Sequence, residues 1–228
     1  MIDHAHDLAC VRDATERLLT AVAKLDNAAL AEPSRLPGWT RGHVLAHVAR
    51  NADALVNVLE GRPMYASAEA RDADIERDAP RPLDAQLADL RESTARFQAS
   101  GDAPADWTRT VELRNGVTDS ASRVPFRRWA EVDLHHVDLG IGYELEDLPA
   151  EFMEREIGFL ADRFAGHKDV PSTGLAAEGG ATWTTGGGAE GTPVTVEGTA
   201  ADLLGWLAGR REGSGLTVQG ALPKLPPL

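Results

Sequence analysis

The sequence is poor in cysteine and aromatic residues and has fewer bases than acids. Its single cysteine excludes an internal disulfide and fits a reducing cytoplasm. Lysine and arginine number 23 against 36 acidic residues, so a net charge of −13 offers no basic field for nucleic-acid phosphates. No apolar run approaches the roughly 20 residues that span a bilayer, and the polar first residues do not resemble a signal peptide. We therefore expect a cytoplasmic monomer that binds neither nucleic acid nor membrane, with an acidic surface that favours solubility over association.

The 228 residues indicate one large domain or two small ones, and the 43% hydrophobic content is enough for a core. Alanine and leucine carry much of the apolar content, which favours helices. Apolar residues recur at helical spacing over residues 7–28, 40–60, 83–100 and 125–140. Strand-like segments follow these helices and do not alternate with them. The pattern predicts a four-helix bundle over residues 1–146 and a small α+β domain over residues 147–228.

The second predicted domain contains a stretch rich in glycine and threonine, residues 172–198. Its alternation predicts short antiparallel strands joined by glycine turns. The three glycines at 186–188 lack the lysine and the strand–helix context of a phosphate-binding loop, so we interpret them as a hairpin turn. A helix capped by Thr199 follows, and a last strand is expected near residue 217.

The fourth predicted helix carries the residues most suggestive of chemistry. Glu131, His135 and Asp138 lie at i, i+4 and i+7 and share one face. Burial of such groups without partners costs several kcal/mol, roughly 2–7 for a polar group. The face is therefore either exposed to solvent with pairs along the helix, or part of a site. Two helices that present metal ligands inward can close a site between them.

The second predicted helix offers two histidines four residues apart, His43 and His47. Either one alone is more often a half-buried, hydrogen-bonded residue than a ligand. The pair raises the metal interpretation, although spacing does not decide between them. No glutamate follows the first histidine, so the zincin signature is absent.

Three further residues have both a structural and a functional interpretation. Cys10 is expected to be structural, since nothing near it in sequence would lower its pKa. Arg71 lies in an acidic run and is either solvated or a clamp for a carboxylate. Arg210 stands at the end of a predicted helix, where the dipole favours a basic residue.

Four segments resemble the DinB-like, mycothiol-dependent maleylpyruvate isomerases. They are residues 37–49 (PGWTRGHVLAHVA), 63–71 (PMYASAEAR), 131–140 (EVDLHHVDLG) and 207–210 (LAGR). The resemblance follows the chain in order over nearly its whole length. It implies a DinB-like bundle that carries a zinc site, followed by the smaller domain.

The resemblance also implies roles for individual residues. It favours His47 over His43 as a ligand of the zinc ion, together with Glu131 and His135, and leaves one position open. It implies that Arg210 reaches over the metal site and binds the thiol cofactor and substrate. Asp138 would support the ligands and the cofactor site, and Arg71 would lie near the substrate.

The activity implied by the resemblance is cis–trans isomerisation of maleylpyruvate to fumarylpyruvate in gentisate degradation. The implied partners are this small dianionic substrate and mycothiol, whose thiolate adds reversibly to the double bond. One alternative is a mycothiol S-transferase on the same scaffold. Another is a non-catalytic metal-binding bundle, for which a closed four-ligand site is expected.

Overall fold

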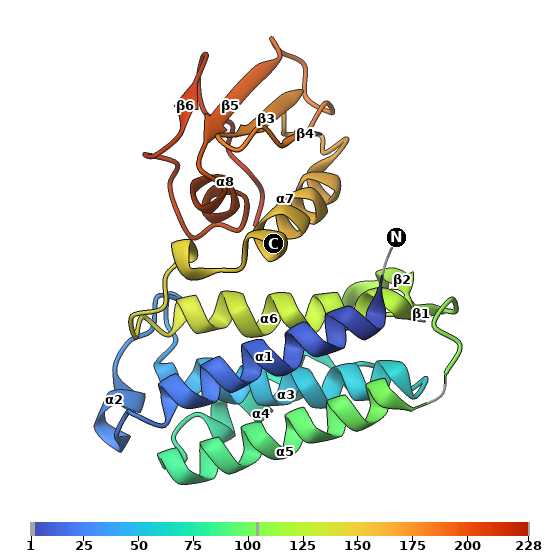
Figure 1. The fold of residues 1–228 in the computed structure, drawn as a ribbon, viewed down its shortest axis with the longest axis vertical. Helices are drawn as coiled ribbons and strands as arrows, with labels where there is room; N and C mark the ends of the chain where they lie inside the picture. The colour runs from blue at the N-terminus through green and yellow to red at the C-terminus, as the bar shows by residue number, and fades with distance from the viewer. Residues whose placement is uncertain (1–2, 104, 228) are drawn as a thin grey trace. The chain divides into compact units, whose positions relative to one another are not determined.

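The computed structural model describes residues 3–103 and 105–227, and the chain divides into two compact units. The units span Met1–Tyr143 and Glu144–Leu228. The first is a bundle of helices, and the second combines two helices with a small sheet (Figure 1). The predicted fold class, mainly helical with an α+β C-terminal part, is confirmed.

Four long helices run alongside one another in the N-terminal unit (Figure 1). They are α1 (His4–Val22), α3 (Arg41–Leu59), α5 (Leu83–Asp102) and α6 (Val124–Asp138). The connections contain α2 (Asn27–Ala31), α4 (Ala68–Asp78), the paired strands β1 (Thr110–Glu112) and β2 (Thr118–Ser120), and the 3-10 turns η1 (Arg114–Gly116) and η2 (Ala121–Arg123). Because α3 packs against both α5 and α6, it is the central helix of the bundle.

Side-chain caps fix where several of these helices begin. Asp3 accepts hydrogen bonds from the backbone of Ala5 and His6, both at 3.1 Å, and starts α1. The single helix expected over residues 7–28 is wrong, because α1 ends at Val22 and the chain turns. Asp26 then caps the separate helix α2 by accepting from the Ala29 N–H at 2.8 Å.

A buried glutamine connects the start of α3 to the neighbouring helices. The Gln86 side-chain amide donates to the carbonyl oxygens of Gly42 (3.2 Å), Asp78 (3.1 Å) and Ala79 (3.0 Å). The backbones approach so closely here that a Cβ added at Gly42 would lie 2.3 Å from the Ala79 oxygen. The first turn of α3 is therefore fixed against the end of α4 and the start of α5.

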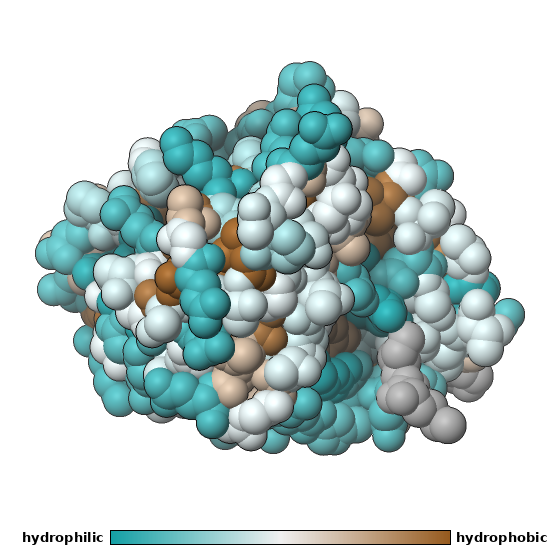
Figure 2. Space-filling model, turned by 90° about the horizontal axis from the view of Figure 1, so that it is seen from above, coloured by the Kyte–Doolittle hydropathy of each residue, from teal (hydrophilic) through white to brown (hydrophobic). Residues whose placement is uncertain are grey.

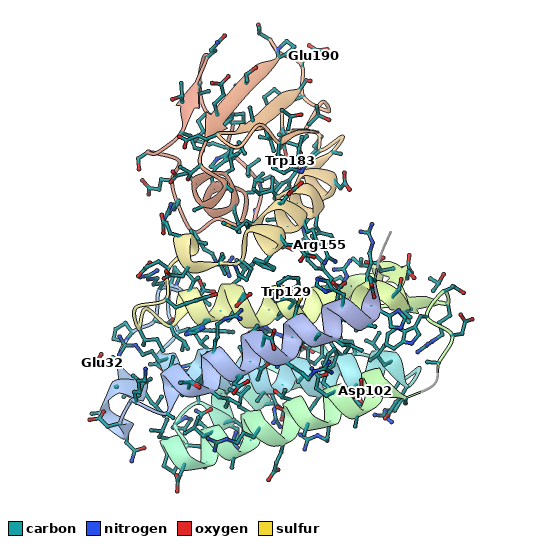
Figure 3. The ribbon with its side chains drawn as sticks, viewed as in Figure 1. Glu32, Asp102, Trp129, Arg155, Trp183 and Glu190 are labelled. Atoms are coloured by element: carbon teal, nitrogen blue, oxygen red, sulfur yellow. The ribbon has the colours of Figure 1, made fainter. Side chains whose placement is uncertain are left out.

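The C-terminal unit packs two helices against one side of a four-stranded sheet (Figure 1). Its elements are η3 (Leu145–Asp147), α7 (Ala150–Phe164), β3 (Thr173–Ala177), β4 (Thr182–Thr185), β5 (Val194–Gly198), α8 (Ala200–Leu207) and β6 (Thr217–Val218). The strand order is β4-β3-β5-β6. Trp183 on β4 faces α7 (Figure 3), where its indole nitrogen would lie 3.3 Å from a Cβ added at Gly158. Gly158 thus permits close packing of α7 on the sheet.

The expectation of purely antiparallel strands is wrong. β3 pairs with β4 in antiparallel register but with β5 in parallel register, Leu175 opposite Val196. The glycines at 186–188 therefore form part of a crossover from β4 to the far side of β3, and not a hairpin turn. A Cβ added at Gly186, which has φ 66°, would lie 2.1 Å from the Pro171 oxygen. These glycines permit the crossover to pass close to the backbone of residues 166–171.

Large hydrophobic side chains are rarely highly exposed among the described residues. The face in Figure 2 is mostly teal and white, with brown in small separate areas. Val117 is the one large hydrophobic residue that is highly exposed among the described residues, at 46%. Within that same part of the chain, no helix combines the length and hydropathy needed to cross a membrane.

Replacing Gly42 with alanine tests the close approach at the start of α3. The added methyl group meets a backbone oxygen that cannot move independently, so we expect a loss of about 1–3 kcal/mol in the free energy of unfolding. Denaturant titration followed by circular dichroism measures it. Gly179→Ala is the control, because nothing lies within 4 Å of the added Cβ there. Equal stabilities for the two variants would contradict the prediction.

Candidate metal centre

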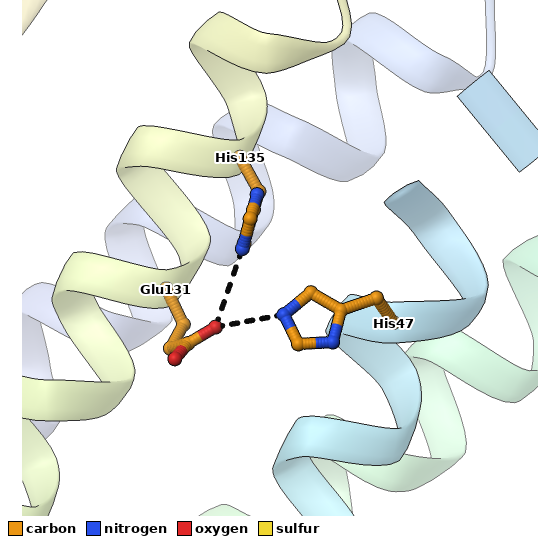
Figure 4. Close-up of side chains that lie close together, drawn as sticks. All are labelled: His47, Glu131 and His135. Carbon is orange, nitrogen blue, oxygen red and sulfur yellow. Dashed lines mark hydrogen bonds and ion pairs between the residues drawn. The ribbon is translucent and has the colours of Figure 1, made fainter. Parts of the chain in front are cut away.

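Two imidazoles and one carboxylate converge between α3 and α6 (Figure 4). Nε2 of His47 lies 3.0 Å from Oε2 of Glu131, and Nε2 of His135 lies 3.4 Å from the same oxygen. One ligand atom from each residue lies within 4.8 Å of both others. The imidazole rings meet edge to face, with centroids 4.6 Å apart. The structure thus brings together the three residues predicted as ligands.

The packing of α3 against α6 explains why these side chains meet. Glu131 and His135 lie one turn apart on α6, and His47 lies opposite them on α3. The His47 and His135 side chains are only 8% and 14% exposed, and Glu131 is 33% exposed. The alternative that this face is exposed to solvent with pairs only along the helix is wrong, because Glu131 pairs with His47 on the neighbouring helix.

His43 has a different task, which explains why it is not part of the cluster. Its Nδ1 accepts a hydrogen bond from the backbone N–H of Thr40 at 3.2 Å, and the Thr40 hydroxyl accepts from the His43 N–H at 3.4 Å. This reciprocal arrangement is a capping box at the start of α3. Nε2 of His43 faces Glu76 at 3.4 Å. The histidine four residues before His47 therefore fixes the helix start.

Asp138 supports the cluster from the last turn of α6. Its Oδ2 lies 2.8 Å from Nδ1 of His135, and its side chain is 1% exposed. A carboxylate at this nitrogen favours the tautomer with the proton on Nδ1, so the lone pair of Nε2 is directed toward Glu131. Asp138 thus orients His135.

Arg71 on α4 contacts the cluster at His47, whereas Asp138 contacts it at His135. Its Nη2 lies 3.3 Å from Nδ1 of His47, and its Nη1 donates to Asp72 at 2.7 Å. Its guanidinium carbon lies 6.0 Å from the centroid of the Tyr65 ring. Arg210 belongs to the C-terminal unit, where its Nη1 donates to the carbonyl of Ala208 at 3.0 Å. Its role over the metal site stays a prediction.

Burial and neighbouring charges shift the pKa values of the three cluster residues in different directions. Burial alone would raise the pKa of Glu131, but hydrogen bonds and charges from His135 and His47 hold it well below its ordinary value. Burial lowers the pKa of His47, and Glu131 opposes this only in part. For His135, burial also lowers the pKa, yet Asp138 and Glu131 outweigh it and the net shift is upward. The carboxylate is thus ionised and His47 is held neutral.

Several residues around the cluster were missed by the sequence interpretation. The Trp39 ring lies 5.5 Å from the His47 ring, between centroids, beside the cap of α3. Arg128, one turn before Glu131, is fully buried and donates to the Val48 carbonyl at 2.8 Å and to Asn51 at 2.9 Å. Arg128 precedes Glu131 by three residues, so the sequence alone could have placed the two side chains on the same side of the helix.

Cys10 lies on α1, which contributes none of the three cluster residues. Its Sγ lies 3.5 Å from Nε2 of His6, one turn earlier on the same helix. The sequence interpretation overlooked this neighbour when it found nothing near Cys10. The thiol is half-buried.

The cluster fits the coordination chemistry of zinc. Zinc takes imidazole nitrogens and carboxylate oxygens at about 2.0–2.1 Å, so tetrahedral ligand atoms lie about 3.3 Å apart. The two contacts of Glu131, at 3.0 and 3.4 Å, are close to that spacing. Three protein ligands with a fourth position left for water or substrate are typical of catalytic sites, whereas structural sites use four protein ligands.

Comparison with known proteins places both units in one family. The mycothiol maleylpyruvate isomerase N-terminal domain matches residues 11–140, and the MDMPI C-terminal domain matches residues 147–227. The crystal structure of a mycothiol-dependent maleylpyruvate isomerase is 29% identical, with a TM-score of 0.89 over 99% of this chain and 97% of that chain. A histidine-to-alanine mutant of a mycothiol-dependent maleylpyruvate isomerase gives 28% identity, the same TM-score and the same coverage. None of the curated proteins compared matches the chain.

The contact between Asp138 and His135 leads to a prediction about metal affinity. Asp138→Asn keeps the shape of the side chain but removes the charge that orients and polarises His135, so we expect divalent-metal affinity to fall about 10–100-fold. Competition with a chromophoric chelator measures it. Asp13→Asn removes the same charge from an exposed position on α1 and should leave the affinity unchanged. Equal affinity in both variants would exclude Asp138 from this role.

Proposed function

The chain belongs to the mycothiol maleylpyruvate isomerase family, and on that premise we propose that it converts maleylpyruvate to fumarylpyruvate with mycothiol and a zinc ion. The reaction is a step of gentisate degradation. The observation that carries the proposal is the convergence of His47, Glu131 and His135 inside a unit that matches this family over residues 11–140.

The donor set supports a catalytic role for the metal. Two imidazoles and one carboxylate would hold a zinc ion with one coordination position left open, which supports a catalytic site over a non-catalytic bundle. His47, Glu131 and His135 would hold the zinc ion, which would lower the pKa of a bound thiol so that it ionises near neutral pH. The chain's own thiol, Cys10, lies on α1, outside the three-residue cluster, so the reaction needs a thiol from solution.

The substrate determines what the remaining residues have to do. Cis–trans isomerisation requires the carbon–carbon double bond to become single while rotation occurs. Addition of sulfur to the carbon β to the carbonyl achieves this, and the electron pair moves to the carbonyl oxygen as an enolate. Rotation and loss of sulfur then restore the double bond and the thiolate, so nothing is consumed. The protein must bind two carboxylates and stabilise the charge on the enolate oxygen.

The contact between Arg71 and His47 supports a substrate role for this arginine. Arginine can only donate, so Nδ1 of His47 accepts in the contact at 3.3 Å. When Nε2 of a neutral imidazole binds a cation, its one proton is on Nδ1, and Arg71 can no longer donate there. The guanidinium is then available for a substrate carboxylate, which it can bind through two parallel hydrogen bonds. We assign Arg210 to the same task, as the second cation for a dianionic substrate.

A direct assay tests the proposed reaction. Zinc-loaded protein with mycothiol should isomerise maleylpyruvate with no net loss of thiol, as followed by absorbance and thiol titration. Chelation and His47→Ala should each remove bound zinc and activity together, because each eliminates part of the coordination. Stoichiometric consumption of mycothiol would instead identify an S-transferase. A metal-free variant with full activity would refute the site.

Replacing Arg210 with alanine tests the second cation. We expect zinc content to be unchanged and kcat/KM for maleylpyruvate to fall at least about tenfold, the effect of losing one charge-assisted hydrogen bond of 1.5–3 kcal/mol. Steady-state kinetics and metal analysis measure the two quantities. Arg91→Ala, an exposed position on α5, is the control for loss of one positive charge. Kinetics equal to those of this control would remove Arg210 from the mechanism.

A further inference from the structure

The N-terminal unit contains a pocket of about 620 Å³ between the C-terminal end of α3, residues 61–68 and the β1–β2 hairpin. Val58, Val111 and Leu113 are buried apolar residues in its wall. Polar groups from the hairpin and from Tyr65 complete it. None of the residues predicted to act in catalysis lines it, so the proposed reaction does not account for it.

Three arginines line the pocket, and two of them already have structural tasks. Arg62 donates to the Asn57 side chain at 3.0 and 2.7 Å. Arg109 donates to the carbonyl of Asp106 at 2.8 Å and to the carbonyl of Leu59. These contacts hold the two connections that form the walls.

Arg114 and Asn115 differ from these two arginines. Within the part of the chain that the structure describes, no hydrogen bond or ion pair engages either side chain. Both lie in η1, the turn between β1 and β2, and Asn115 has a left-handed backbone with φ 61°. Their guanidinium and amide groups can therefore bind a molecule in the pocket.

Tyr65 connects this pocket to the metal cluster. It lines the pocket, and its ring lies 6.0 Å from the guanidinium carbon of Arg71, which contacts His47. Burial raises the pKa of Tyr65, as does the charge of Glu131, whereas Arg71 and Arg114 oppose the shift. Charged groups of both the metal cluster and the hairpin thus influence the Tyr65 phenol. The pocket and the metal cluster are therefore neighbours.

The size and position of the pocket suit an extended ligand. Val58 follows His47 by eleven residues on α3, which corresponds to about 16 Å at 1.5 Å per residue. A pocket of 620 Å³ lies within the range of roughly 300–1,000 Å³ that accommodates drug-sized ligands. Maleylpyruvate is much smaller than such a ligand and needs to reach the cluster. A molecule with its thiol at the metal and a larger body some distance away fits both requirements.

We propose that this pocket binds the polyhydroxylated body of mycothiol, the glucosamine and inositol rings, while the cysteinyl thiol extends past Tyr65 to the metal cluster. The inference rests on the proposed function for the identity of the thiol. Arg114 and Asn115 donate hydrogen bonds to ring hydroxyls, and the exposed Glu112 accepts from them. A mixture of donors, an acidic acceptor and an apolar wall matches a neutral polyol better than a dianion.

Binding of the thiol-free fragment N-acetylglucosaminyl-inositol, whose nitrogen is a neutral amide as it is in mycothiol, tests the pocket without the reaction. We expect saturable millimolar binding to the wild type by ligand-observed NMR, unaffected by chelation of the metal. Arg114→Ala and Asn115→Gly should each weaken it about tenfold or more, as for loss of a hydrogen bond to the ligand. Glycine is chosen at 115 because it tolerates the left-handed backbone. Arg91→Ala should bind as the wild type does.

Kinetics separate the pocket from the substrate site. In Arg114→Ala the KM for mycothiol should rise about tenfold, with the KM for maleylpyruvate unchanged. No saturable binding of the fragment to the wild type, or a rise confined to the KM for maleylpyruvate, overturns the proposal. If the fragment binds as expected but no isomerisation occurs, the proposed function fails while the pocket assignment stands.

Discussion

Glu131 presents one carboxylate oxygen to two imidazoles inside a helical bundle, and the surrounding structure depends on keeping that arrangement. Glu131 is only partly exposed, so the loss of either imidazole would leave its charge incompletely compensated. Both histidines must therefore be held at the right height and rotation on their helices. The capping box of His43 fixes the start of α3, and Gln86 fixes that first turn against α4 and α5. Contacts outside the three-residue cluster thus position the helix that carries His47, while Asp138 orients His135 directly.

The same helix carries other buried charges. Asp133 has a charged partner, whereas Arg128 donates only to neutral groups and its buried Nε and Nη2 make no hydrogen bond within the described part of the chain. Asp133 accepts from the Trp129 indole at 2.6 Å and pairs with Arg17 at 3.1 Å. Arg128 is fully buried, and burial lowers its pKa to about 10, so it still carries a positive charge at neutral pH. That charge lies close enough to Glu131 to influence it electrostatically. A protein of net charge −13 thus keeps a buried cation near the carboxylate of the cluster.

The helical architecture and the pairing of Glu131 with His135 could be predicted, because both depend on local spacing. Glu131 and His135 are neighbours on any helix, and the resemblance of residues 37–49 to a known family selected His47. The capping role of His43 was not predictable, because histidine is an unusual capping residue and its task depends on the orientation of Thr40. The apolar face of α6 was unclear because Arg128 and Asp133 are buried by tertiary partners. The parallel pairing of β3 with β5 was missed because strand alternation does not encode direction.

The register of α6 has a consequence for how this fold can be altered. One inserted residue would rotate everything after it by about 100°, which would separate His135 and Asp138 from Glu131 and Asp133 from Trp129. Length changes within that helix would therefore disrupt the three-residue cluster and the packing of the bundle together. The turn at residues 113–117 and the connection at residues 61–67 lie outside the long helices. Sequence variation is best confined to these two segments, where chemical diversity can be explored at low risk to the three-residue cluster.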